Sequence, residues 1–143
     1  MDNKNGNIEP AGIIVITHSN YGESLLAAAE SILGPIANSV AMSVDITADV
    51  KETVESLRST VVSMNKGNGV LILTDMFGGT PTNLSLSLLS IDGVEVVTGV
   101  NLPMILRAAS HSTTKIEALA EEARQSGLQG IVSASEMLRK KKG

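Results

Sequence analysis

Short apolar runs alternate with longer amphipathic stretches along the chain. Residues 12–17 and 70–74 are continuous runs rich in aliphatic and β-branched side chains, with no polar alternation. Such runs predict strands that are covered on both faces, as in a parallel sheet. Residues 40–44 and 94–98 predict two further strands.

Helical spacing of apolar residues marks the segments between these strands. It is found at residues 21–33, 49–64 and 113–126 and in a short stretch after Leu102. Gly127 is expected to cap the helix over 113–126. Thr80 followed by Pro81 predicts another helix start, with the hydroxyl at the N-cap and proline at N1, and this helix continues to about Leu89.

The order of these elements defines the fold class. Strands that alternate with helices imply right-handed βαβ units, and hence an open parallel sheet flanked by helices on both faces. Near the C-terminus, residues 130–132 predict a short last strand, followed by a turn or helix from Ser135. We therefore expect one α/β domain over residues 11–138, between a flexible tail at 1–10 and a basic tail at 139–143.

The composition narrows the function. Of 143 residues only Tyr21 and Phe77 are aromatic, which disfavours nucleic-acid binders that stack bases on aromatic platforms. The net charge of −4 also disfavours nucleic acid as a partner. No cysteine is present for a disulfide or a thiolate metal site. Because the chain has neither a signal peptide nor an apolar run of about 18 residues, we expect a cytoplasmic protein without membrane insertion.

Open parallel sheets bind ligands outside the carboxyl ends of their strands, where three loops are expected: residues 17–20, 75–80 and 99–101. His18 in the first loop can act as a nucleophile, a general base or a metal ligand, or can be a capping or core histidine without chemistry. A metal would need further ligands, and His111 has no evident spacing with His18, so no metal is expected. We interpret His111 as a surface or capping residue.

Asp75 ends a buried strand, where a carboxylate is costly unless it is paired. If the strands before Asp75 and His18 are neighbours, the carboxylate can accept a hydrogen bond from Nδ1–H of the imidazole. That bond would fix the tautomer and leave Nε2 with its lone pair outward. The alternative is an aspartate that caps its own loop by accepting from backbone amides.

Gly78, Gly79 and Thr80 come directly before a predicted helix. Glycines allow close approach to the backbone, and the first N–H groups of a helix favour a phosphoryl group. The Walker, Rossmann and serine-hydrolase motifs are absent. A histidine nucleophile, an orienting aspartate and an anion cradle, without a cluster of Mg²⁺ ligands, indicate a phosphohistidine carrier without a cofactor rather than an ATP-using kinase.

Three segments carry a resemblance to a known family: Ile14-Val15-Ile16-Thr17-His18, Thr74-Asp75-Met76-Phe77-Gly78-Gly79-Thr80-Pro81-Thr82-Asn83 and Gly99-Val100-Asn101-Leu102-Pro103-Met104. Over residues 11–135 and in this order, the chain resembles the enzyme IIA domain of the mannose-type (mannose/fructose/sorbose) phosphoenolpyruvate-dependent sugar phosphotransferase system. The resemblance implies a phosphotransferase with a central parallel sheet flanked by helices.

The resemblance also implies roles for individual residues. His18 would accept a phosphoryl group from the phosphocarrier HPr and pass it to a histidine-bearing IIB domain or subunit, while Asp75 would hydrogen-bond the His18 ring. The remaining implied roles are phosphoryl binding by Gly78, Gly79 and Thr80, and a place at the border of the site for Phe77 and Asn101.

The family commonly forms a homodimer, in which residues 130–132 would be exchanged as a strand that lies antiparallel on the partner's sheet. Many relatives have glycine after the histidine, where this chain has Ser19. Since no IIB domain is fused to the chain, a separate IIB partner is expected, and the protein would be cytoplasmic or peripheral to a membrane transporter complex.

Two other functions stay open from the sequence. One is a stand-alone regulatory protein of the same fold, whose choice of partner changes when His18 is phosphorylated. The other is the phosphocarrier subunit of a dihydroxyacetone kinase system, which also has a first strand ending in His-Ser, although residues 77–81 fit the mannose type better. An apolar rim for protein partners, or alternatively part of the core, is expected of Met76, Phe77, Leu102 and Met104.

Overall fold

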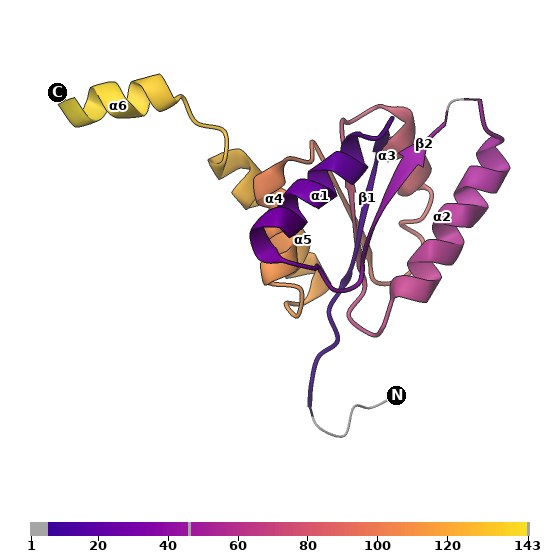
Figure 1. Cartoon of the computed structure of the whole chain (residues 1–143). Helices are drawn as coiled ribbons and strands as arrows, with labels where there is room; N and C mark the ends of the chain where they lie inside the picture. Colours follow the sequence, from indigo (N-terminus) through magenta and orange to yellow (C-terminus); the bar gives the residue numbers. More distant parts are fainter. Residues whose placement is uncertain (1–5, 46, 143) are drawn as a thin grey trace.

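Strands and helices alternate along the chain, as the hydrophobic pattern predicts (Figure 1). The computed structural model describes residues 6–45 and 47–142. The strands are β1 (Gly12–His18), β2 (Ser39–Val44), β3 (Val70–Thr74) and β4 (Val94–Thr98). The helices are α1 (Tyr21–Leu33), α2 (Val50–Met64), α3 (Thr80–Leu86), α4 (Leu102–Ser110), α5 (Ile116–Gln129) and α6 (Ala134–Lys142).

Within these described ranges the strands form a four-stranded sheet in the order β2-β1-β3-β4, and neighbouring strands are parallel. β1 and β3 occupy the centre and are buried along almost their whole length, which is why their sequences are continuously apolar. In the register, Ile16 lies beside Thr74, and Thr74 lies beside Thr98. The carboxyl ends of the strands therefore meet at one edge of the sheet.

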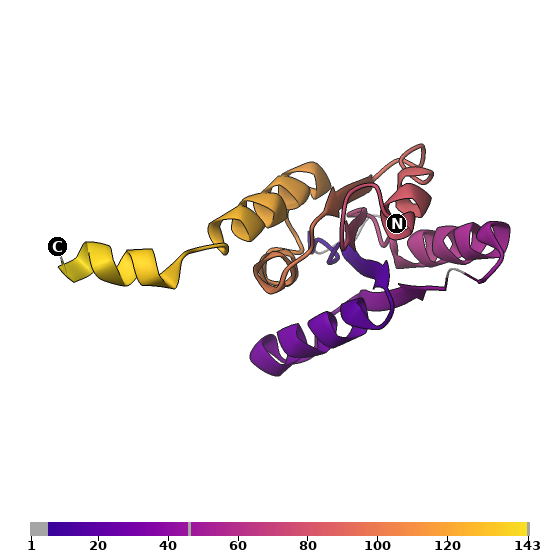
Figure 2. The ribbon, with the colours of Figure 1, turned by 90° about the horizontal axis from the view of Figure 1, so that it is seen from above.

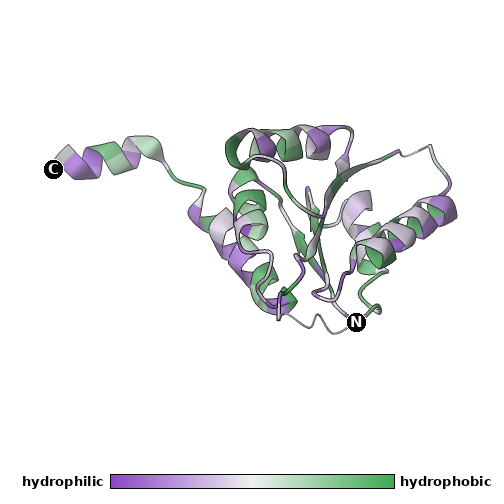
Figure 3. Ribbon diagram, turned by 60° about the horizontal axis from the view of Figure 1, so that its bottom comes forward, coloured by the Kyte–Doolittle hydropathy of each residue, from purple (hydrophilic) through white to green (hydrophobic). Residues whose placement is uncertain are grey.

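Helices cover both faces of the sheet (Figures 1 and 2). α1, α4 and α5 pack on one face, in a core that includes Val15 and Leu73. α2 and α3 pack on the other face, in a core that includes Ile16 and Ile72. The helices carry hydrophilic as well as hydrophobic residues, as expected of helices with one buried side (Figure 3). The open parallel α/β fold predicted from the sequence is confirmed.

The start of α3 differs from the prediction. Gly79, not Thr80, is the N-cap, and Thr80 is the first helical residue; within the described residues no side chain caps this end. Gly79 has extended backbone angles (φ −79°, ψ 165°), which is the conformation of an N-cap, so the helix begins one position earlier than the hydroxyl suggested. The helix also ends at Leu86 instead of about Leu89.

Gly127 was expected at the end of a helix but lies inside α5, which continues to Gln129 and is capped by Gly130. A Cβ at Gly127 would lie 2.7 Å from Met104 Cγ. The glycine therefore permits close packing of α5 against α4 instead of ending the helix.

The C-terminal segment runs away from the domain (Figures 1 and 2). Residues 130–132 form no strand in this described part of the chain, and Ile131 and Val132 are exposed. A strand needs a neighbour for its backbone hydrogen bonds, and the single chain places none there. Exchange of this segment between two chains stays a prediction. α6 confirms the helix expected from Ser135, and it includes residues 139–142 of the predicted basic tail.

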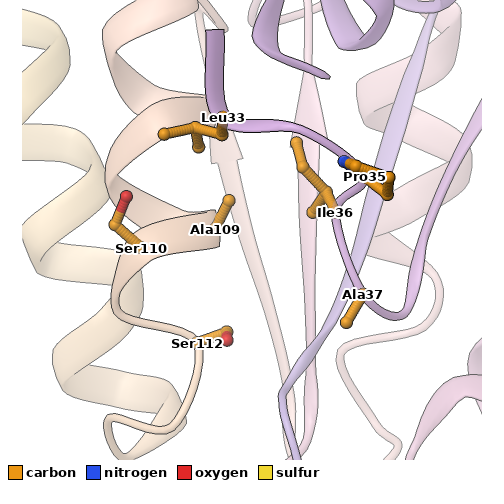
Figure 4. A pocket seen from close by; sticks show the side chains of 7 residues that line it. All are labelled: Leu33, Pro35, Ile36, Ala37, Ala109, Ser110 and Ser112. Carbon is orange, nitrogen blue, oxygen red and sulfur yellow. The ribbon is translucent and has the colours of Figure 1, made fainter. Parts of the chain in front are cut away.

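A pocket of about 320 Å³ opens at the amino edge of the sheet, where α1 and α4 end (Figure 4). The backbone N–H of Ala11, just before β1, donates to Ser112 O beside it. The pocket is lined by Leu33, Pro35, Ile36, Ala37, Ala109, Ser110 and Ser112. It lies at the opposite edge of the sheet from His18.

Candidate functional site

The topology brings His18 and Asp75 together. His18 is the last residue of β1, and Asp75 directly follows β3. Because β1 and β3 are adjacent and parallel, these residues meet at the carboxyl edge although they are 57 positions apart. The predicted neighbourhood of the two strands is confirmed.

A short hydrogen bond joins the two side chains: His18 Nδ1 lies 2.6 Å from Asp75 Oδ2. The backbone N–H of His18 donates to the same oxygen at 2.9 Å, and that of Met76 donates to Oδ1 at 3.0 Å. Both interpretations of Asp75 from the sequence therefore apply, since it contacts the ring and also caps its loop. An ionised carboxylate here favours the proton on Nδ1, which leaves the Nε2 lone pair available.

Burial and charge differ between the two partners. The His18 side chain is 43% exposed, whereas that of Asp75 is 13% exposed. Burial raises the pKa of the Asp75 carboxyl, but the hydrogen bonds from the His18 backbone and ring, the charge of the ring and the Met76 N–H outweigh it, so this pKa is lowered. The site thus combines an accessible imidazole with a carboxylate that stays ionised.

The backbone at Gly79 passes against the imidazole. A Cβ built on Gly79 would lie 2.9 Å from His18 Cε1, the ring carbon between the two nitrogens. Gly78 has a φ of +82°, a conformation that favours glycine. Thr80 is exposed and begins α3, whose first N–H groups have no partner within the helix. The structure thus places the Gly79 backbone against the imidazole, with Gly78 and Thr80 on either side of it in the chain; phosphoryl binding by these three residues stays a prediction.

The expected apolar rim is smaller than predicted. Phe77 is 76% exposed, and Met76 is also exposed in the loop that follows Asp75. Met104, in contrast, is buried in the core beneath α4, and Leu102 packs against that core. The hydrophobic spacing within α4 accounts for this placement.

Asn101 begins α4 at the same edge of the sheet. Its Oδ1 accepts from the Met104 backbone N–H at 3.2 Å, and its Nδ2 donates to Gly127 O at 3.1 Å. The preceding residue is held to β3, since the Val100 N–H donates to Thr74 O. The Asn101 side chain therefore caps α4 and connects it to α5.

His111 is the C-cap of α4, and its Nδ1 lies 3.6 Å from Glu122 Oε2 on α5. Arg107 Nε lies 3.5 Å from the same oxygen. This histidine contacts the adjacent helix and lies at the opposite end of α4 from Asn101, so the structure agrees with its interpretation as a surface or capping residue.

The sequence reasoning missed two buried threonines beside the site. Thr17 Oγ1 accepts from the Gly22 N–H at 2.7 Å and donates to His18 O at 3.1 Å, which fixes the turn from β1 into α1. Thr82 Oγ1 contacts Thr74 and the loop after Asp75. In the sequence, Thr17 is a hydroxyl at the end of an apolar run and Thr82 is one in the first turn of a helix, and neither position by itself indicates a partner.

Two features are absent from residues 6–45 and 47–142. No group of three or more histidine, aspartate or glutamate side chains is arranged to hold a metal ion. None of the helices there has the length and hydropathy needed to cross a bilayer.

The fold and the site define an α/β protein with an aspartate-paired histidine at the carboxyl edge of a parallel sheet. A family model described as "PTS system fructose IIA component" (EIIA-man) matches residues 12–124. The chain belongs to this mannose-type IIA family of the sugar phosphotransferase system, which confirms the resemblance noted in the sequence.

Relatives agree with this assignment. The chain is 37% identical over 101 residues to the PTS system sorbose-specific EIIA component of Lacticaseibacillus casei, covering 68% of this chain and 70% of that protein. It is 29% identical over 125 residues to the PTS system mannose-specific EIIAB component of Escherichia coli K12, covering 83% of this chain but only 39% of the longer protein.

Solved structures share the fold. The mannose/sorbose specific IIA subunit from Enterococcus faecalis superposes with a TM-score of 0.78 at 26% identity, covering 87% of this chain and 95% of that one. The PTS IIA protein associated with the fucose utilization operon of Streptococcus pneumoniae gives a TM-score of 0.80 at 26% identity, with 90% and 96% covered.

Proposed function

We propose that this chain is a IIA component that takes a phosphoryl group from phospho-HPr onto Nε2 of His18 and passes it to a IIB partner. The observation that carries the proposal is the 2.6 Å contact between Nδ1 of a 43% exposed imidazole and a carboxylate that is only 13% exposed. Because Nδ1 is occupied, Nε2 is the nitrogen that can attack. The family match supports the sugar phosphotransferase system over the dihydroxyacetone kinase system.

The transfer step exchanges one P–N bond for another. The Nε2 lone pair of His18 attacks phosphorus, the P–N bond of the donor phosphohistidine breaks, and its electron pair stays on the donor nitrogen. Phosphorus carries its three terminal oxygens across, and the proton on Nδ1 stays in place. Transfer onward repeats the step with a nucleophilic histidine of IIB as the attacking group.

Two groups of this chain stabilise that step. Positive charge grows on the imidazole as Nε2 forms its bond, and the ionised Asp75 at 2.6 Å favours that charge. Negative charge is spread over the phosphoryl oxygens, for which we assign the backbone at Gly78, Gly79 and Thr80 as the cradle; the Gly79 N–H, which donates to Met76 O at 3.4 Å, would have to turn to the phosphoryl group. The close approach of Gly79 to Cε1 supports this placement.

We assign partner contact to Met76 and Phe77, whose exposed apolar side chains follow Asp75 in the same loop. Exposed aromatic side chains are frequent anchors of protein interfaces. A cytoplasmic location and a homodimer that exchanges residues 130–132 belong to the same proposal. The exposed Ile131 and Val132, together with the open edge of β4, support the dimer.

A reconstituted transfer assay tests the proposal. The protein is incubated with phosphoenolpyruvate, enzyme I and HPr, and an acid-labile, base-stable phosphoryl group is expected on the wild type. His18→Ala should remove this label entirely, because the acid-labile, base-stable group marks a phosphohistidine and the second histidine of the chain, His111, is at the far end of α4. His111→Ala is the matched control and should be labelled at the normal rate. A label that persists in His18→Ala would refute the assignment.

A further inference from the structure

Two buried hydroxyl groups form hydrogen bonds that connect β3 and α3 to the loop that carries Asp75. Thr74 ends β3 and Thr82 is in the first turn of α3, and both are completely buried. Thr82 Oγ1 donates to the carbonyl oxygen of Met76 at 2.6 Å. The oxygens of Thr74 and Thr82 are also 2.6 Å apart.

The direction of these hydrogen bonds follows from counting protons. A carbonyl oxygen can only accept, so the single hydroxyl proton of Thr82 is used on Met76 O. The proton between the two threonines must therefore come from Thr74. The result is a directed chain from the end of β3 through α3 to the loop.

This chain continues to the imidazole. The N–H of Met76 donates to Asp75 Oδ1, and Asp75 Oδ2 accepts from the backbone and ring of His18. Met76 is thus fixed at its carbonyl by Thr82 and at its N–H by Asp75. The Met76 carbonyl also accepts from Gly79 N–H at 3.4 Å, which closes the turn that places Gly79 against the ring.

We propose that Thr82 is a positioning residue for phosphoryl transfer, acting through Met76 and supported by Thr74. It sets the distance at which the Asp75 carboxylate and the Gly79 backbone meet the His18 ring. Since both hydroxyls are buried, water does not replace the bond when it is lost. The inference rests on the proposed function, because it concerns the rate of that same step.

Thr82→Val is the decisive variant, since valine keeps the shape of threonine and removes the donor. We expect the rate of phosphorylation at saturating phospho-HPr to fall about 10-fold with KM within twofold, as for other misplaced catalytic groups. Thr82→Ser keeps the hydroxyl and should restore most of the rate. In NMR spectra of the unphosphorylated protein, the Nδ1–H signal of His18 should be lost or broadened in Thr82→Val only.

Ser85→Ala is the matched control. Ser85 is also a fully buried hydroxyl of α3, but among the described residues its hydroxyl donates to Pro81 O within the helix at 2.7 Å and not to the loop. It should lower the melting temperature without changing the rate or the Nδ1–H signal. If Thr82→Val does not fold, Thr74→Val provides the second test, with a smaller loss of rate because Thr82 still donates to Met76 O.

The outcomes separate this inference from the proposed function. A wild type that is not labelled on His18 contradicts the function, while the Nδ1–H signal still tests whether Thr82 positions the ring. A labelled wild type with equal rates and equal ring signals in Thr82→Val overturns the positioning role. Equal losses of rate in Thr82→Val and Ser85→Ala would also overturn it, because the effect would then come from stability alone.

Discussion

The two histidines of this chain face carboxylates in similar ways but differ in what holds the carboxylate. Their side chains are about equally accessible, at 43% for His18 and 41% for His111. Nδ1 of His18 is 2.6 Å from Asp75, whereas Nδ1 of His111 is 3.6 Å from Glu122, beyond hydrogen-bond length. Exposure alone therefore does not distinguish a candidate nucleophile from a surface histidine.

The difference lies in the backbone around each acid. Asp75 is fixed by two backbone N–H groups at the end of a buried strand, so its position relative to His18 is set by the sheet. Glu122 is on a helix, 33% exposed, and among the described residues its buried Oε2 has no hydrogen-bond partner. A short aspartate at a strand end orients an imidazole with little entropy to lose, whereas a longer side chain on a helix does not.

Exchanging each carboxylate for its amide gives the largest expected effect. Asp75→Asn can present its NH₂ to Nδ1 and so favours the wrong tautomer, and we expect the rate of transfer from phospho-HPr to fall about 100-fold. Glu122→Gln should leave that rate unchanged. Single-turnover labelling measures both. A rate for Asp75→Asn within twofold of the wild type would show that the 2.6 Å contact does not orient a reactive ring.

Gly79 provides the next test, because its backbone lies against the His18 ring and leaves no room for a side chain. Gly79→Ala places a methyl group 2.9 Å from Cε1, and its φ of −79° accepts alanine without strain. The ring must shift, and we expect transfer to slow about 10-fold. Gly12→Ala is the control: its Cβ would lie 3.0 Å from Met64 Cβ, so it crowds the opposite end of β1 from His18. Comparable slowing in both variants would contradict a local effect on the imidazole.

Much of this site could be predicted from the sequence, because short stretches of the chain indicate the strands that carry its residues. The apolar runs before His18 and Asp75 predict central strands, and neighbouring parallel strands bring their ends together. The N-cap at Gly79 and the interior position of Gly127 were not predictable, since each depends on what the glycine packs against. The hydrogen bonds from Thr74 to Thr82 and from Thr82 to the loop could not be predicted either, because they join a strand end to a helix through tertiary contact.

The contribution of the Asp75–His18 interaction to the free energy of unfolding should depend on pH, in the direction that the lowered pKa of Asp75 sets. Its pKa is lowered in the folded state, so the stabilisation is complete above the ordinary carboxyl pKa of about 4 and is lost as pH falls through the lowered value. Urea unfolding should therefore show the free energies of unfolding of wild type and Asp75→Asn differing by about 1 kcal/mol at pH 7, and this difference should shrink as the pH falls below the ordinary carboxyl pKa. In a His18→Ala background the pH-dependent difference should shrink but persist, because the N–H groups of residues 18 and 76 still donate to the carboxylate. If His18→Ala leaves the difference in unfolding free energy unchanged, the backbone N–H groups alone keep Asp75 ionised. The difference between the His18 and His111 sites would then come from the loop around Asp75, and not from the contact between Asp75 and the imidazole.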